Sequence, residues 1–227
     1  MANKRYDTRS GDTAPASISN VHLPGILDEN DKKIWILRAA TRLFANRGYA
    51  GTTVREIVEM AGVTKPTLYY YFKNKEDVYI NLMDLAMKAL SSIIAQSLAT
   101  QGNMRARLIN LYTTLYGLFR ANTDFLRFMN CTFFGPPGTT PDYNLGAINE
   151  SLREALMELL RAGIAEGDLV EENLRPVILL LMGFMRYMIE ILVSDPVNPH
   201  LDPASIAKAI NLIFDGPRAT SPPAIQP

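Results

Sequence analysis

The 227-residue sequence is poor in the residue types that carry redox and acid–base chemistry. Cys131 is the only cysteine, so no disulfide forms within the chain and a secreted fold held by disulfides is excluded. The only histidines, His22 and His200, lie in a predicted arm and a proline-rich connection, which are poor places for a positioned base. The sequence has no metal-ligand cluster, glycine-rich phosphate loop or nucleophile motif. We therefore expect neither an enzyme nor a cofactor.

Long hydrophobic runs are also lacking. Residues 1–20 are mostly polar or small, unlike the apolar core of a signal peptide. The longest apolar run, Val177 to Met185, stops at Arg186 and is too short to cross a bilayer. The sequence therefore predicts a cytoplasmic protein with no membrane association.

Net charge is absent overall but not locally. The formal charge of the chain is zero, yet residues 32–75 hold nine basic and two acidic side chains. This segment therefore carries +7 and the rest of the chain −7. Such an asymmetry is typical of a segment that meets a polyanion, although a solvated charged face would have the same composition.

Apolar residues recur at spacings of three and four along most of the chain, which predicts helices. The first is expected over Asp28–Gly48, where the glycine ends it. The other helices are expected over residues 53–61, 65–72, 74–98, 105–121, 123–133, 143–167, 173–193 and 203–214. We find no internal repeat and no alternating strand pattern, so the fold class is all-α.

Composition divides the chain into four segments. Residues 1–27 are predicted to be a flexible arm and residues 216–227 a proline-rich tail. The helical body between them divides into residues 28–76, with three predicted helices, and residues 77–215, which hold the others.

The helix-turn-helix is indicated by two short helices joined through Gly62 and Val63. A capping box, Thr53-Val-Arg-Glu56, begins the first of them. At about 100° per residue, Leu68 and Phe72 of the second helix face inward together. Pro66, Thr67 and Tyr70 then point outward, with Tyr69 and Tyr71 on the flanks. The alternative is a packing cluster of three tyrosines.

These motifs resemble the N-terminal domain of the TetR family of repressors. The matching stretches are Ala39-Ala-Thr-Arg-Leu-Phe44, Gly48-Tyr-Ala-Gly-Thr-Thr53, Arg55-Glu-Ile57, Ala61-Gly-Val-Thr-Lys-Pro-Thr-Leu-Tyr-Tyr-Tyr-Phe72 and Lys73-Asn-Lys-Glu76. The resemblance covers about a quarter of the chain. It implies that residues 28–76 are a DNA-reading domain with a helix-turn-helix. For residues 77–215 it implies only a divergent helical ligand-binding and dimerisation domain, here called the effector domain.

The resemblance also implies which residues meet DNA. Thr53 and Arg55 would contact it from the start of one helix, and the start of the next helix would approach the bases. Tyr69, Tyr70 and Lys75 would hold phosphates, and Tyr71 stands where many relatives have histidine. The full predicted set is Thr53, Arg55, Thr64, Lys65, Pro66, Thr67, Tyr69, Tyr70, Tyr71 and Lys75.

A homodimer is expected through Asn173–Val193 and Pro203–Phe214. The first of these helices is apolar almost all round, so it must be covered on more than one side. The core of one monomer could cover it. Family members, however, dimerise through their last two long helices, and a two-fold dimer suits a palindromic DNA site.

A pocket for a small hydrophobic effector is expected in the effector domain. Its candidate lining is Tyr112, Tyr116, Phe119, Phe128, Met129, Phe133, Met182 and Arg186. Ordinary core packing is the alternative for each aromatic or methionine. Arg186 is either a polar anchor in this pocket or the partner of Glu190 one turn along. Cys131 is expected to be a buried, inert thiol.

The sequence thus predicts a DNA-binding transcriptional regulator, with repression as the family default. A small apolar or aromatic ligand would release it from a palindromic operator. The alternative is a regulator controlled by a protein partner. The helix from Asn74 to about Leu98 joins the two domains, so we expect it to transmit the ligand signal.

Overall fold

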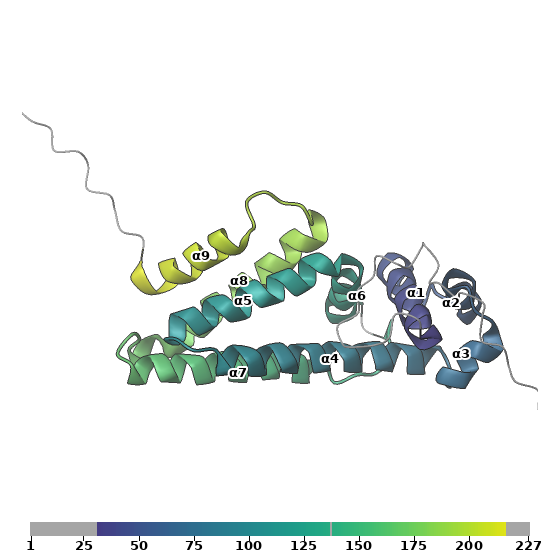
Figure 1. Ribbon diagram of the computed structural model, residues 1–227, viewed down its shortest axis with the longest axis horizontal. Helices are drawn as coiled ribbons and strands as arrows, with labels where there is room; N and C mark the ends of the chain where they lie inside the picture. Colours follow the sequence, from purple (N-terminus) through teal and green to yellow (C-terminus); the bar gives the residue numbers. More distant parts are fainter. Residues whose placement is uncertain (1–30, 137, 217–227) are drawn as a thin grey trace, which may run out of the picture.

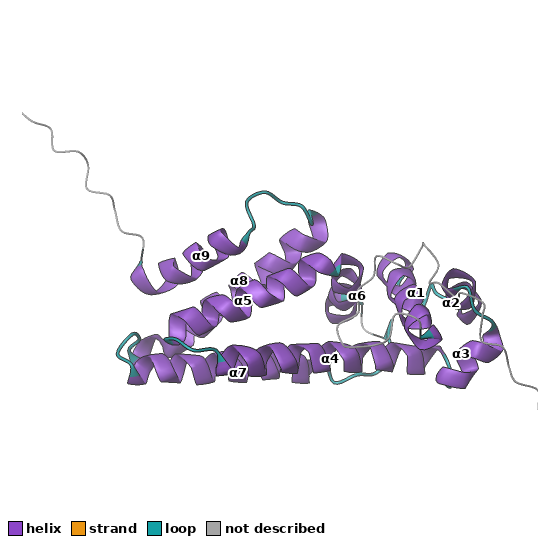
Figure 2. Ribbon diagram, viewed as in Figure 1, coloured by secondary structure: helices purple, strands orange, loops and turns teal. Residues whose placement is uncertain are grey.

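The computed structural model describes residues 31–136 and 138–216, and within these the chain is helical throughout apart from its turns and loops (Figure 2). These residues form nine α-helices and one short 3-10 turn, and none of them lies in a strand. The all-α prediction is confirmed. The expected flexible arm, residues 1–27, and residues 217–227 of the expected tail lie outside the described residues.

The first three helices are α1 (Lys32–Arg47), α2 (Val54–Ala61) and α3 (Lys65–Tyr71). They stand at one end of the molecule (Figure 1). Asp31 caps α1 by accepting a hydrogen bond from the Lys33 amide at 2.8 Å, so this helix begins at Lys32, four residues after the predicted start. Gly62 ends α2 with φ +65°, a left-handed conformation that glycine adopts without strain.

Six helices follow and make up the effector domain. They are α4 (Lys75–Ala99), α5 (Met104–Ala121), α6 (Thr123–Phe134), α7 (Leu145–Ala165), α8 (Leu174–Ser194) and α9 (Pro203–Asp215), and a 3-10 turn at Glu171–Asn173 precedes α8. Helices α4 and α7 run side by side along one edge, and α9 lies at the opposite edge on α5 (Figure 1). Helix α6 lies against α1, next to the DNA-reading domain.

Two hydrophobic cores result. One joins α5, α7, α8 and α9 inside the effector domain. The other is built from α1, α2, α3 and the start of α4, and it continues past the predicted boundary at residue 76 as far as Met83. Phe125 and Phe128 of α6 also belong to this second core. Helix α6 therefore completes the core of the DNA-reading domain from the effector side.

Candidate DNA-binding surface and ligand pocket

The start of α2 is fixed by a complete capping box. The Thr53 hydroxyl accepts from the Glu56 amide at 3.3 Å, and the Glu56 carboxylate accepts from the Thr53 amide at 2.8 Å. Arg47 donates to the same carboxylate at 2.6 Å. The hydrogen bonds that the Glu56 carboxylate accepts lower its pKa, and the bond from the Thr53 backbone amide has the largest effect. The predicted cap is confirmed, and it holds Thr53 and Arg55 at the tip of the domain.

Helix α3 is anchored by two side chains and presents the others to solvent. Leu68 is 0% and Phe72 2% exposed, whereas Tyr70 is 83% exposed. Thr64 caps the helix: its hydroxyl accepts from the Thr67 amide at 3.4 Å, with Pro66 in the first turn. The predicted orientation of this helix is confirmed for its inward and outermost residues, although Thr67 is half-buried.

The remaining residues predicted to contact DNA lie around α3. Lys65 and Tyr69 are exposed, and Tyr71 is half-buried with its ring edge-to-face on Tyr70 at 4.9 Å. Arg55 is exposed on α2, where its Nε donates to Glu59 at 2.7 Å. The fold therefore gathers α2, α3 and the start of α4 at one end (Figure 1), but the contacts of single residues with DNA stay predictions.

Lys75 has a second role that the sequence did not indicate. Its Nζ donates to the carbonyl oxygens of Tyr49 and Thr52, both at 2.8 Å, and lies 4.1 Å from the centre of the Tyr49 ring. Desolvation lowers the pKa of this ammonium group. Two of its three N–H donors are thus committed to the α1–α2 connection. The partners lie 26 and 23 residues away, beyond the reach of any local pattern.

The candidate ligand residues do not form one cluster. Tyr112 and Tyr116 are core residues, and their hydroxyls donate to the carbonyl oxygens of Leu181 and Leu201, both at 2.8 Å. Phe119 and Met182 are partly buried against the same core. Burial also raises the pKa of Tyr112. The hydroxyl of each tyrosine is therefore satisfied without a ligand.

Phe128 and Met129 pack on the other core, that of the DNA-reading domain. The Phe128 ring lies 5.8 Å from the Phe44 ring and 5.6 Å from the Tyr79 ring. Tyr79 is fully buried, and its hydroxyl has no hydrogen-bond partner among the described residues. Aromatic side chains of α1, α4 and α6 thus meet where the two domains join.

Arg186 belongs to a third location, between α6 and α8. The Arg186 guanidinium donates to Asn130 Oδ1 at 2.7 Å and lies 3.7 Å from the centre of the Phe134 ring. Within residues 31–136 and 138–216, Arg186 forms no ion pair with Glu190. Of the two roles that the sequence left open for Arg186, the pair with Glu190 is therefore not formed, and its contacts lie on α6 instead. Phe133 is half-buried, and its ring lies 6.2 Å from that of Phe134.

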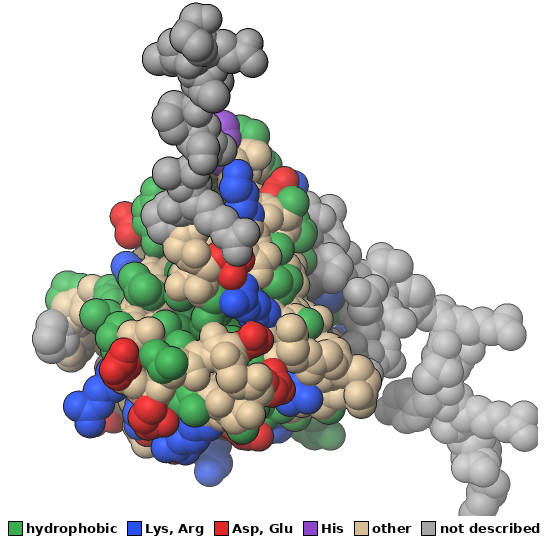
Figure 3. Space-filling model, turned by 90° about the vertical axis from the view of Figure 1, so that its left-hand side faces the viewer, with side chains coloured by type: hydrophobic (Ala, Val, Ile, Leu, Met, Phe, Trp, Pro, Cys, Tyr) green, Lys and Arg blue, Asp and Glu red, His purple; other side chains and the backbone are tan. Residues whose placement is uncertain are grey.

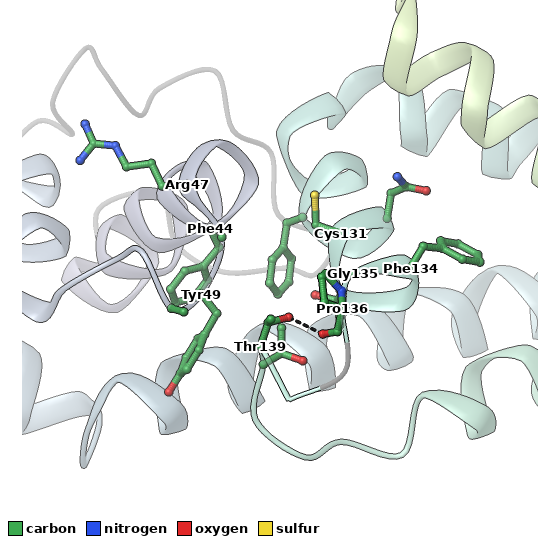
Figure 4. Close-up of a pocket in the computed structure, with 14 residues that line it drawn as sticks. Phe44, Arg47, Tyr49, Cys131, Phe134, Gly135, Pro136 and Thr139 are labelled. Carbon is green, nitrogen blue, oxygen red and sulfur yellow. Dashed lines mark hydrogen bonds between the residues drawn. The ribbon is translucent and has the colours of Figure 1, made fainter.

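A pocket of about 430 Å³ lies between the two domains, here called the junction pocket (Figure 4). Its lining comes from the end of α1 and the following turn, and from α6 and the following loop: Phe44, Arg47, Gly48, Tyr49, Ala50, Phe128, Asn130, Cys131, Thr132, Phe134, Gly135, Pro136, Thr139 and Thr140. Phe128 is the only predicted ligand residue in this lining. Cys131 is exposed there, so the expectation of a buried thiol is wrong.

The outer face of α8 is apolar and uncovered. Leu179, Leu180 and Tyr187 are 74%, 54% and 61% exposed, and Leu212 of α9 is 46% exposed. A second pocket, of about 370 Å³, lies beside Leu180 at the end of the molecule far from α3. At that end, acidic and basic side chains are interspersed with hydrophobic ones (Figure 3). The exposed apolar residues of α8 and α9 are typical of an interaction surface.

In the part of the chain that the structure describes, two helical segments are apolar enough, by length and composition, to cross a membrane. They are Lys75–Ala99 and Glu171–Ser194, with mean hydropathies of 1.4 and 2.0. The expectation from the sequence considered only the uninterrupted run that ends before Arg186, and so it missed both. Helices inside water-soluble proteins meet the same criterion, and α8 packs on α5, α6, α7 and α9.

The comparisons with known proteins agree with this architecture. Residues 36–82 match the family described as "Bacterial regulatory proteins, tetR family". The transcriptional activator FasR of Mycolicibacterium smegmatis is 34% identical over 82 residues, which are 36% of this chain and 37% of FasR. The transcriptional repressor KstR2 of Rhodococcus jostii is 27% identical over 140 residues, 62% of this chain and 69% of KstR2. The chain thus spans little more than a third of the length of the first relative.

Solved structures share the fold over most of the chain. The TetR-family regulator PfmR of Thermus thermophilus matches with a TM-score of 0.69 at 22% identity, over 86% of this chain and 100% of PfmR. FadR of Bacillus subtilis, solved in complex with stearoyl-CoA, matches with a TM-score of 0.62 at 21% identity, over 81% of this chain and 98% of FadR. These relatives are named as transcriptional regulators. Residues 36–82 thus match the N-terminal domain of the TetR family of bacterial regulatory proteins, and the described residues share the fold of TetR-family regulators of known structure.

Proposed function

We propose that this protein is a cytoplasmic repressor that binds a palindromic operator as a homodimer and leaves it when a small apolar ligand binds. One observation carries the DNA-binding part of this proposal. Helix α3 is anchored through Leu68 and Phe72 and turns Lys65, Pro66 and Tyr70 to solvent. A lysine at the helix start and hydroxyl-bearing rings beside it suit phosphate and base-edge contacts in a major groove.

The exposed face of α8 supports the homodimer. Leu179, Gly183 and Tyr187 follow one another at spacings of four residues and are all exposed. A partner's copies of α8 and α9 would cover this face, and the glycine, with nothing within 4 Å of an added Cβ, leaves room for a close approach. The interface would comprise Asn173–Val193 and Pro203–Phe214. Two-fold symmetry would then present two α3 helices to a palindromic site.

The relatives guide the choice of ligand and of regulatory sign. One relative is named an activator and another a repressor, so repression is our choice between two precedents. The FadR structure contains stearoyl-CoA, and another matching structure is titled a ketosteroid transcriptional regulator. Fatty acyl and steroid compounds are therefore the first ligands to test on this protein.

The experiment begins with selection of bound fragments from a random DNA pool. We expect a palindrome whose half-sites lie one helical turn, about 34–36 Å, apart. Lys65→Ala should weaken binding to the selected site at least tenfold. Lys88→Ala removes an equally charged, exposed lysine from α4 and should change affinity less than twofold. If the two substitutions change the affinity equally, Lys65 and α3 do not contact the DNA as proposed.

The ligand part is tested on the same DNA complex. A fatty acyl or steroid compound that releases the protein at micromolar concentration would support control by a small molecule. If no compound releases the DNA but a co-purifying protein does, control by a protein partner would replace it.

A further inference from the structure

The junction pocket has walls that belong to different domains. Phe44, Tyr49 and Ala50 come from the end of α1 and the turn that leads to α2. Cys131, Gly135 and Pro136 come from α6 and the loop that follows it. Figure 4 shows Phe44 and Tyr49 on one side of the space and Cys131, Gly135 and Pro136 on the other. Any ligand held there would contact both domains at once.

The lining defines the chemistry of the ligand. Phe44 and Phe128 form an aromatic wall, and the Asn130 amide and the Thr132 and Thr140 hydroxyls add polar groups. Among the described lining residues only Arg47 is charged, and its guanidinium is held by Glu56 and points away from the space in Figure 4. The volume of about 430 Å³ lies toward the lower end of the range for small-molecule sites. A compact, uncharged and mainly apolar molecule fits these features.

One wall of the pocket is tied to the proposed dimer helix. Asn130 and Phe134 are both lining residues, and both are held by Arg186 of α8. The Phe134 side chain points away from α1 in Figure 4. The other wall is part of the core of the DNA-reading domain, through Phe44. A change in the width of the pocket therefore changes the position of α1 relative to α8.

We infer that the junction pocket is the effector site, and that a compact, uncharged, mainly apolar ligand acts there by separating α1 from the end of α6. This inference rests on the proposed control by a small molecule and assigns its place. The ligand favours the arrangement in which the pocket is wider, and the two DNA-reading domains of the dimer are then wrongly spaced for DNA. Arg186 is a positioning residue, since it holds the α6 wall against α8.

Tyr79 and the rings that it contacts, those of Phe44, Tyr49 and Phe128, are here called the aromatic cluster. This cluster is suited to rearrangement. The Tyr79 hydroxyl is buried without a hydrogen-bond partner among the described residues, so the packed arrangement leaves one donor unsatisfied. Tyr79 contacts the rings of Phe44, Tyr49 and Phe128, all of which line the pocket. Because the packed arrangement leaves this hydroxyl unsatisfied, that arrangement is stabilised less than a fully hydrogen-bonded arrangement would be.

The first experiment needs no natural ligand, because the single cysteine of the chain lies in the pocket. The full-length protein is reacted with N-ethylmaleimide or with the bulkier N-(1-pyrenyl)maleimide, and its affinity for the selected operator is measured. We expect the pyrenyl adduct to bind at least tenfold more weakly and the ethyl adduct to change less than twofold. Cys131→Ser treated with either reagent should behave as it does untreated.

A pyrenyl adduct that melts like the unmodified protein and still binds DNA within twofold would overturn the inference. If the pyrenyl adduct unfolds, N-phenylmaleimide provides a smaller probe of the same wall. If the N-phenylmaleimide adduct binds the operator at least fivefold more weakly, the result supports the inference. A smaller loss of operator affinity overturns it.

The second experiment uses 2-naphthol and decanol as compact apolar probes, together with any compound that releases the operator. Each compound is tested for its ability to slow the reaction of Cys131 with a thiol reagent, and for DNA release from the wild type and from Cys131→Trp. A releasing compound should slow thiol modification at least fivefold and lose its effect on Cys131→Trp. If release occurs without thiol protection, the pocket assignment fails while ligand control stands. If no compound releases DNA, ligand control fails, and the maleimide result decides whether the pocket is coupled to DNA binding.

Discussion

At the scale of single residues, the DNA-reading domain separates side chains that build it from side chains that face solvent. The helical period predicts that Leu68 and Phe72 face inward, and both are buried in the structure. The structural role of Lys75 could not be predicted from any period, because its partners are carbonyl groups in the turn after α1. A charge counted as part of a DNA-binding surface is therefore also a structural contact inside the domain.

Lys75→Met should lower both stability and DNA affinity. It removes two charge-assisted hydrogen bonds and leaves the carbonyls of Tyr49 and Thr52 without this donor, so we expect the free energy of unfolding to fall by about 1–3 kcal/mol. Lys73→Met, at an exposed position in the same turn, should stay within about 0.5 kcal/mol of the wild type. Chemical denaturation measures both.

The salt dependence of DNA binding separates the two roles of Lys75. If its ammonium group also meets a phosphate, the slope of log affinity against log salt should flatten by about 0.9 in the variant. An unchanged slope together with a lowered stability would leave only the structural role.

At the scale of elements, helix ends follow from local chemistry, whereas helix contacts do not. Thr53 and Glu56 form the capping box that their spacing predicts, and Gly62 ends α2 as expected. The contact of α6 with α1 could not be read from the sequence, because an aromatic stripe packs equally well in either core. Phe128 was accordingly assigned to a ligand pocket in the effector domain, whereas it packs in the core of the DNA-reading domain.

The close approach of α5 and α7 makes Gly163 sensitive to substitution. A Cβ at Gly163 would come within van der Waals overlap of the buried Met104 side chain, so Gly163→Ala should destabilise the protein by about 1–3 kcal/mol. Gly117→Ala places the same methyl group on an exposed part of α5 with nothing within 4 Å. It should stabilise the protein by up to about 1 kcal/mol, through helix propensity. Thermal unfolding of the two variants should therefore shift in opposite directions.

The apolar face of α8 predicts the outcome of a charge substitution. Leu179→Glu places a carboxylate in the proposed interface, where burial without a partner is costly, so light scattering at micromolar concentration should detect monomers. Val197→Glu alters an equally exposed apolar residue outside α8, and this variant should remain dimeric. If both variants remain dimeric, Leu179 does not lie in the dimer interface.

At the scale of the whole molecule, helices α4 and α6 both join the effector domain to the DNA-reading domain. Helix α4 contacts α1 at one end and α5 and α7 further along, which is consistent with its predicted role in transmission. Helix α6 is the second connection, since it packs on both α1 and α8. Arg186 lies at its contact with α8 and the aromatic cluster at its contact with α1.

Substitution of Arg186 should separate DNA binding from its control. Arg186→Met removes the hydrogen bond to Asn130 and the charge over the Phe134 ring, so the α6 wall is no longer held against α8. We expect operator affinity within threefold of the wild type, but at least a fivefold smaller response to the pyrenyl adduct at Cys131. Glu190→Gln, one turn along the same helix, should leave the response unchanged. Equal responses in both variants would contradict the positioning role of Arg186.

The sequence by itself determined the helices, their caps and the orientation of α3, because each depends on residues within a few positions of one another. The spacing of Leu68 and Phe72, the Thr53 capping box and the glycine after α2 are enough for these features. Only the tertiary structure decided that α6 completes the core of the DNA-reading domain, that Lys75 holds the α1–α2 turn and that Arg186 reaches Asn130. These contacts join residues far apart in the chain, and they depend on how whole helices pack, which no local pattern encodes.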